Sequence, residues 1–103
     1  MKKIEIISPE EIHQCAKDKG WWDRERQIPE LLCLMHSELS EALEGYRNHI
    51  PEGHPGCFSE ELADVIIRIW DVCGAMGIDI AEAVQRKHEY NLTRSYRHGN
   101  KRC

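Results

Sequence analysis

A chain of 103 residues is long enough for one domain with a modest core, and short enough for oligomerisation to help bury apolar surface. Its composition, 41% hydrophobic and 31% charged, is that of a soluble globular protein. No apolar run reaches transmembrane length, and Met1–Glu5 lacks the apolar segment of a signal peptide. We therefore expect a cytoplasmic protein without a membrane partner.

The net charge of −4 is unevenly distributed. Residues 86–103 hold six basic side chains against one acidic one, a net +5 that leaves −9 for residues 1–85. A basic C-terminal segment on an acidic body suits nucleic-acid binding, or it supplies cations to a phosphate whose metal lies on the acidic part. We expect one domain, residues 1–103, with residues 98–103 as a flexible basic tail.

The first helix is predicted from Ser8, as N-cap of a capping box with Glu11, to about Lys19, where Gly20 ends it. The connection at residues 21–27 then holds two adjacent tryptophans and two arginines. One interpretation is that a tryptophan plugs the end of a helical bundle while the arginines are solvated. The other is a stacking and cationic platform for a planar ligand such as a nucleobase.

The second helix is predicted from Ile28-Pro29 to about Arg47, with an apolar stripe along one side. The stripe consists of Leu31, Leu32, Met35, Leu39, Ala42, Leu43 and Tyr46. At about 100° per residue, Glu38 lies beside this stripe and Glu44 points almost directly away from it. We therefore expect a partly buried Glu38 and a solvated Glu44.

The third helix is predicted to start at Ser59 as N-cap, and Gly74 and Gly77 allow it to stop. This helix is apolar over most of its circumference, so more than one of its faces should be buried. We expect a second subunit to bury the faces that the rest of the chain leaves exposed. Its remaining polar strip holds Glu61, Asp64 and Arg68.

The fourth helix is predicted to start at a capping box, Asp79 with Glu82, and to fade by about Tyr96. The chain holds no credible strand beyond a weak segment at Ile4–Ile7. The predicted fold class is all-α, a four-helix antiparallel bundle that oligomerises through its helices.

Two carboxylate pairs, Glu38 with Glu41 and Glu61 with Asp64, stand out as candidate metal ligands. Each pair is spaced i, i+3, which places its side chains about 5–6 Å apart on one helix face. Residues 48–58 form a turn region, so the two helices tend to pack antiparallel and bring the four carboxylates together. Either these acids are solvated, or a hard cation such as Mg²⁺ neutralises them.

Lys87, Asn91 and Arg94 recur at i, i+4 and i+7 on one face of the fourth helix. Alone this face is an exposed basic surface, but beside a carboxylate-held cation it becomes a set of phosphate ligands.

Histidine and cysteine offer weaker signals. His49, His54 and Cys57 form a possible zinc set, although their spacing fits no standard site. The chain has an odd number of cysteines and no C-x-x-C, so we expect reduced thiols that pack as small hydrophobes. The cysteines are Cys15, Cys33, Cys57, Cys73 and Cys103.

The chain resembles the MazG-like nucleotide pyrophosphohydrolases of the all-α NTP pyrophosphatase superfamily. Three segments carry the resemblance, within roughly residues 20–102. They are His36-Ser37-Glu38-Leu39-Ser40-Glu41-Ala42-Leu43-Glu44, Glu60-Glu61-Leu62-Ala63-Asp64-Val65-Ile66, and Lys87 through Asn91 to Arg94. One departure is Ser37, where many relatives have a doubled glutamate.

The resemblance implies Mg²⁺-dependent cleavage of a (d)NTP to (d)NMP and pyrophosphate, with Mn²⁺ as a substitute, by a homodimer or dimer of dimers. It implies that four carboxylates are catalytic and hold the metal, and that one of them orients the attacking water: Glu38, Glu41, Glu61 and Asp64. It implies that five residues bind the substrate: Trp22, Arg26, Lys87, Asn91 and Arg94. Nucleic acid is not an expected partner.

Two alternatives remain open. The chain is a non-catalytic helical dimer that binds a nucleotide or a partner, or it is an enzyme whose substrate is a phosphoribosyl nucleotide or a damaged nucleotide. The first alternative predicts neither stabilisation by Mg²⁺ nor release of pyrophosphate.

Overall fold

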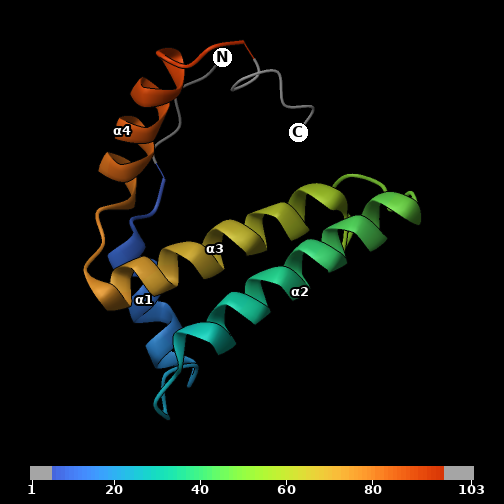
Figure 1. Cartoon of the computed structure of the whole chain (residues 1–103). Helices are drawn as coiled ribbons and strands as arrows, with labels where there is room; N and C mark the ends of the chain where they lie inside the picture. Colours follow the sequence, from blue (N-terminus) through green and yellow to red (C-terminus); the bar gives the residue numbers. More distant parts are fainter. Residues whose placement is uncertain (1–5, 97–103) are drawn as a thin grey trace.

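The computed structural model describes residues 6–96, which fold into four helices (Figure 1). In chain order these are α1 (Pro9–Asp18), α2 (Ile28–Arg47), α3 (Phe58–Met76) and α4 (Ile80–Leu92). Residues 6–96 contain no β-strand, so the predicted all-α class is confirmed for this part of the chain. No helix within it is long and apolar enough to cross a bilayer. The basic tail, residues 98–103, and the beginning of the weak strand segment lie outside the described residues.

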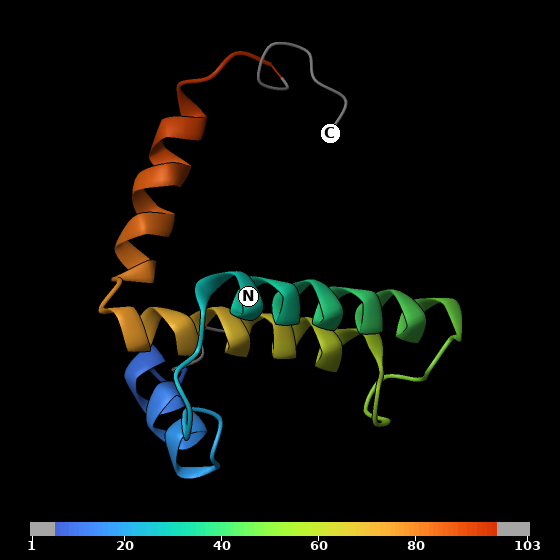
Figure 2. The ribbon, with the colours of Figure 1, turned by 60° about the horizontal axis from the view of Figure 1, so that its bottom comes forward.

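Helices α2 and α3 form an antiparallel hairpin and lie side by side along most of their length (Figures 1 and 2). Ala42 and Gly45 of α2 are buried where the connecting loop folds back. A Cβ atom on Gly45 would lie 2.4 Å from the Gly56 carbonyl oxygen, so only glycine allows this approach. The hairpin sets the register of the two acidic pairs.

Helix α1 crosses α3 near the C-terminal end of α3 (Figure 2). Ile12 is buried there. A Cβ atom on Gly74 would lie 2.7 Å from Cβ of His13 and 2.8 Å from the Pro9 carbonyl oxygen. Gly74 therefore serves the crossing of the two helices, and Gly77, in the left-handed conformation with φ 69°, ends α3.

The helix starts at Ser8 and Asp79 are confirmed, because each side chain accepts the backbone N–H three residues ahead. The predicted N-cap Ser59 is wrong. Helix α3 has Cys57 as its N-cap residue, and the Ser59 hydroxyl donates instead to the Glu52 carboxylate across the loop. Cys57 is buried and fixes the chain where the helix begins.

Helix α4 ends four residues before the predicted Tyr96, at Leu92. The Thr93 hydroxyl donates to the Tyr90 carbonyl oxygen at 2.7 Å, a local bond that competes with helix continuation.

The described helices do not close into a four-helix bundle within one chain. Helices α1 and α2 pack on α3, whereas α4 turns away from the end of α3 (Figures 1 and 2). Large apolar side chains along the hairpin are left exposed. They include Leu39, Leu43, Tyr46, Phe58, Leu62 and Ile66. Covering of this surface by a second subunit stays a prediction.

Candidate metal and ligand site

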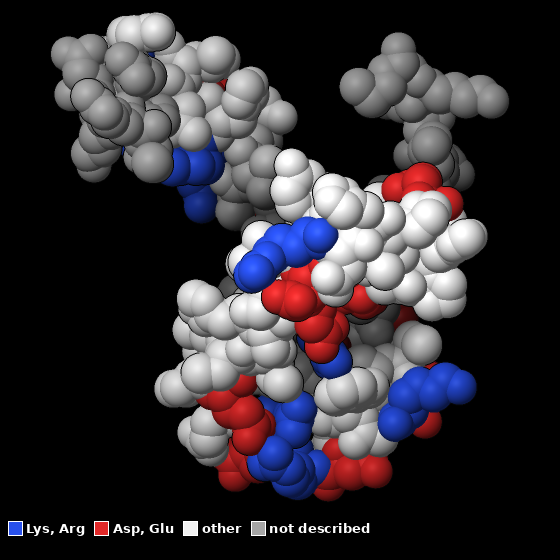
Figure 3. All heavy atoms as spheres, turned by 90° about the vertical axis from the view of Figure 1, so that its right-hand side faces the viewer, with Lys and Arg blue, Asp and Glu red and all other residues white. Residues whose placement is uncertain are grey.

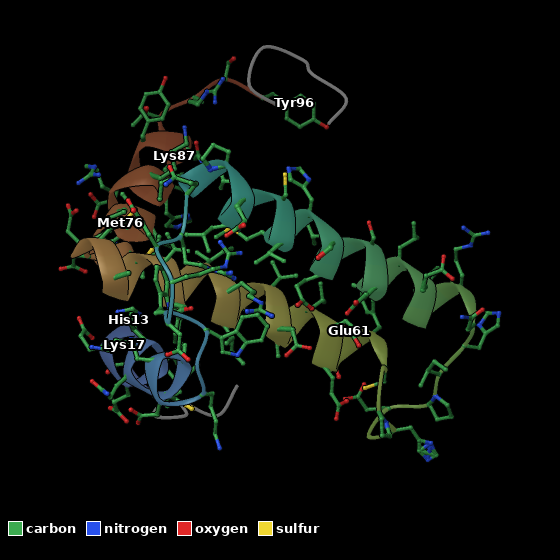
Figure 4. All side chains as sticks on the ribbon, turned by 90° about the horizontal axis from the view of Figure 1, so that it is seen from below. His13, Lys17, Glu61, Met76, Lys87 and Tyr96 are labelled. Atoms are coloured by element: carbon green, nitrogen blue, oxygen red, sulfur yellow. The ribbon has the colours of Figure 1, made fainter. Side chains whose placement is uncertain are left out.

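Three of the four predicted carboxylates converge between α2 and α3. One oxygen each of Glu38, Glu61 and Asp64 lies within 4.8 Å of the others. In residues 6–96 this is the one group of three or more His, Cys, Asp or Glu side chains close enough to share an ion. The described structure therefore gives no support to the zinc set His49, His54 and Cys57. Figure 4 places Glu61 near the start of α3, where α2 runs alongside.

The fourth carboxylate, Glu41, belongs to the same cluster through Glu61. Burial raises the pKa of Glu61, and the charge of Glu41 and a hydrogen bond with it raise that pKa further. The charges of Asp64 and Glu38 act in the same direction. Like charges within a few ångströms favour the protonated carboxyl unless a cation joins them. We call Glu38, Glu41, Glu61 and Asp64 the acidic cluster.

One oxygen of the acidic cluster has no hydrogen-bond partner among residues 6–96. Oε2 of Glu61 is buried and accepts no hydrogen bond from the described part of the chain. A buried acceptor without a donor is costly, and a bound cation or an ordered water is the usual remedy. Because all the donor atoms are carboxylate oxygens, the set matches a hard divalent cation such as Mg²⁺ or Mn²⁺.

Among residues 6–96, a single basic side chain pairs with the acidic cluster. Nε of Arg68 lies 3.3 Å from Oε1 of Glu38, and both side chains are largely shielded from solvent. The Arg68 guanidinium stacks on Trp21, 3.8 Å from the ring centroid. The predicted polar strip on α3 therefore contributes two carboxylates of the acidic cluster and the arginine that pairs with Glu38.

A cavity of about 410 Å³ adjoins the acidic cluster between α1, α2 and α3. Glu38, Asp64 and Arg68 form part of its wall, and Trp21 forms another part. The rest of the lining is mostly apolar and comes from Ile7, Ile12, Cys15, Ala16, Lys19, Ile67 and Asp71. An apolar cavity with a few converging polar groups is the usual form of a small-molecule site.

Trp22 points to a buried carboxylate that the sequence analysis did not select. Its indole Nε1 donates to both oxygens of Asp71 at 3.0 Å, and Nδ1 of His13 lies 2.7 Å from Oδ1. The rings of His13 and Trp22 meet edge to face, with centroids 5.0 Å apart. Asp71 thus ties the loop and α1 to α3. An isolated acid in the apolar part of the third helix was the signal available in the sequence.

Arg26, predicted to bind substrate, forms part of the same loop. Nη1 of Arg26 lies 3.4 Å from Oε1 of Glu30, and Arg24 donates to the other carboxylate oxygen, Oε2, at 2.9 Å. Nε of Arg26 is buried and has no hydrogen-bond partner in the described chain. Arg26 shares a depression of about 300 Å³ with Trp21 and Lys19 but is not part of the cavity wall beside the acidic cluster.

The structure does not bring Lys87, Asn91 and Arg94 to the acidic cluster. Lys87 lies on α4, beyond the end of α3 that is remote from Glu61 (Figure 4). Nζ of Lys87 and the Arg94 guanidinium lie 4.7 and 5.6 Å from the centroid of the Tyr90 ring. Lys87 and Asn91 lie on α4, but Arg94 follows the end of the helix at Leu92, so the predicted common helical face does not extend to Arg94. Oδ1 of Asn91 is buried without a partner in the described residues.

Acidic and basic side chains lie close together on the surface that Figure 3 presents, instead of in separate single-sign patches. The described body therefore has no uniform basic face there for a nucleic-acid backbone.

Comparison of the chain with family models, with curated proteins and with solved structures finds no match.

Proposed function

We propose that this protein is a divalent-cation-dependent nucleoside triphosphate pyrophosphohydrolase, which cleaves a (d)NTP to the monophosphate and pyrophosphate. The observation that carries the proposal is the acidic cluster with its buried, unpartnered Glu61 oxygen beside a cavity of about 410 Å³. The resemblance of the acidic pairs and of the α4 residues to MazG-like enzymes supports the same function.

The acidic cluster fits Mg²⁺, because its ligand atoms are hard oxygens and its charges oppose one another. Glu38, Glu61 and Asp64 would hold the ion, with Glu41 beside them. When bound, Mg²⁺ polarises phosphate oxygens and lowers the pKa of a water molecule. Glu41, exposed and next to Glu61, is suited to orient the attacking water and to accept its proton.

The cavity wall would bind the base and sugar of a nucleotide whose phosphates face the acidic cluster. Trp21 offers an aromatic face, and the apolar residues around it exclude water. Trp22 would act on the ligand through the shape of the loop, since its own N–H is engaged by Asp71.

Lys87 and Asn91 on α4, and Arg94 just after its end, would reach the phosphates from a second copy of the chain. Helix α4 stands apart from the hairpin, and the hairpin leaves an apolar surface exposed (Figure 1). A homodimer or a dimer of dimers covers that surface and supplies the missing cations. Lysine would then act as a point charge and arginine as a bidentate donor.

Thermal unfolding with Mg²⁺ and a non-hydrolysable triphosphate analogue tests the site directly. We expect a higher unfolding midpoint with Mg²⁺, a further increase with the analogue, and no increase in Asp64→Asn. Glu44→Gln is the matched control, because Glu44 lies on the same helix as Glu41 with its side chain 62% exposed. Equal midpoints with and without Mg²⁺ would favour the non-catalytic helical module.

A further inference from the structure

Glu38 belongs to two arrangements at once. It pairs with Arg68 at 3.3 Å, and it also offers an oxygen to the group with Glu61 and Asp64. Its side chain is 14% exposed and that of Arg68 is 22% exposed, so solvent screens the pair only partly. Within residues 6–96, no other Lys or Arg forms an ion pair with Glu38, Glu41, Glu61 or Asp64.

Arg68 has a second favourable contact that does not depend on Glu38. Its guanidinium lies on the face of Trp21, and both side chains line the cavity. The stacking would hold the guanidinium at the cavity even if the ion pair with Glu38 opened. Among residues 6–96, Arg68 uses Nε for Glu38 and its flat face for Trp21. The guanidinium carries two further amino groups that can serve as hydrogen-bond donors to a ligand.

We propose that Arg68 is the resident cation of the acidic cluster, which a divalent cation displaces from Glu38 when it binds. Two cations on one carboxylate repel each other, so the metal and the Glu38–Arg68 pair compete. The displaced guanidinium stays stacked on Trp21 and turns its amino groups to the ligand in the cavity. Arg68 thus lowers metal affinity in the empty site and couples metal binding to ligand binding. This inference rests on the metal site of the proposed function.

Calorimetric titration with Mn²⁺ in the absence of nucleotide tests the competition. We expect Arg68→Gln to bind Mn²⁺ at least about fivefold more tightly than the wild type, a coupling of ordinary size between two sites. Lys19→Gln is the matched control, since Lys19 lines the same cavity and loses the same charge without contacting Glu38 in the described structure. Its Mn²⁺ affinity should change much less.

Tryptophan emission gives a second readout that does not depend on charge alone. Displacement of Arg68 alters the surroundings of Trp21, so Mn²⁺ should change the emission of the wild type. The change should be lost in Trp21→Phe and strongly reduced in Arg68→Gln. Arg68→Lys keeps the charge but loses the planar fork, and it should bind Mn²⁺ more tightly than the wild type and less tightly than Arg68→Gln.

The outcomes separate this inference from the proposed function. If Arg68→Gln binds Mn²⁺ more weakly than the wild type, Arg68 holds Glu38 in place for the metal. The proposal that Arg68 and the metal compete for Glu38 would then be wrong. Equal gains in Arg68→Gln and Lys19→Gln would reduce the effect to overall charge and also overturn it. If the wild type binds no Mn²⁺, the metal site itself fails and the proposed function fails with it.

Discussion

Each carboxylate at the site has different surroundings, and these surroundings suit different tasks. Glu38 is shielded and paired with Arg68, whereas Glu61 has a buried oxygen without a partner. Asp71 is buried too, but it accepts from Trp22 and His13 and so is satisfied within the fold. A satisfied acid stabilises the structure, and an unsatisfied one favours binding of a cation. This contrast separates Asp71 from the acidic cluster.

The raised pKa of Glu61 predicts a pH-dependent change in stability for Glu61→Gln without metal. The folded state favours the protonated carboxyl, so ionised Glu61 destabilises it at neutral pH. In chelator at pH 7, Glu61→Gln should unfold at a higher temperature than the wild type. The difference should shrink as the pH falls through the raised pKa, and vanish below the ordinary value of 4.5.

Thermal unfolding at several pH values measures this effect, and Glu44→Gln is again the control that should show no such gain. A lower midpoint for Glu61→Gln in chelator at pH 7 would show that ionised Glu61 is well accommodated in the fold.

At the scale of elements, the helices and their caps follow from local sequence, but their contacts do not. Apolar periodicity and capping residues place four helices within a few residues of their observed ends. The i, i+3 spacing and a short loop were enough to predict that the acidic pairs meet. By contrast, the bond from Trp22 to Asp71 joins residues 49 positions apart, and no local pattern specifies such a pairing.

The direction of α4 was also beyond a local pattern. It depends on the backbone between Gly77 and Ile80, where the left-handed Gly77 ends α3 and Asp79 caps the next helix. Such a turn permits several directions, and no capping residue selects among them. The prediction of an antiparallel four-helix bundle, oligomerising through its helices, placed α4 against the other helices of the chain, which the local patterns do not require.

Gly74→Ala tests the crossing of α1 and α3. Alanine favours a helix by about 1 kcal/mol over glycine, so propensity alone predicts stabilisation. The added Cβ would lie 2.7 Å from His13 and 2.8 Å from the Pro9 carbonyl oxygen. We expect the contact to prevail and the free energy of unfolding to fall by about 1–3 kcal/mol.

Denaturant titration measures the change in unfolding free energy. Ala75→Gly, at an exposed position in the same helix, should cost no more than about 1 kcal/mol. If Gly74→Ala is more stable than the wild type, the close packing of α1 on α3 is not maintained in solution.

At the scale of the whole molecule, the proposed function needs a second copy of the chain. The acidic cluster and the cavity lie on the body made by α1, α2 and α3. The predicted phosphate ligands Lys87 and Asn91 lie on α4, and Arg94 follows its end. Exposure of the apolar residues of the hairpin to water is unfavourable, and a subunit interface would bury them. A second copy would meet both needs.

Leu43→Lys tests this assembly. Leu43 is 52% exposed in the single chain, so lysine there should leave the helices folded. A charge in an apolar subunit interface is strongly unfavourable, and we expect the variant to be a monomer of 12.0 kDa while the wild type is a multiple of that mass. Light scattering after size exclusion measures the mass, with Gln14→Lys at an exposed position of α1 as the control. A monomeric wild type would contradict the shared site.

Release of pyrophosphate from canonical and modified (d)NTPs in the presence of Mg²⁺ is the most direct test of the proposed function. We predict stoichiometric release of pyrophosphate and monophosphate from at least one of them. Release should require Mg²⁺ and be lost in Glu41→Gln and Asp64→Asn. Both variants should keep the helical content of the wild type, and Glu44→Gln should keep its activity. Full activity of Glu41→Gln, or no release from any nucleotide by the folded wild type, would contradict the account.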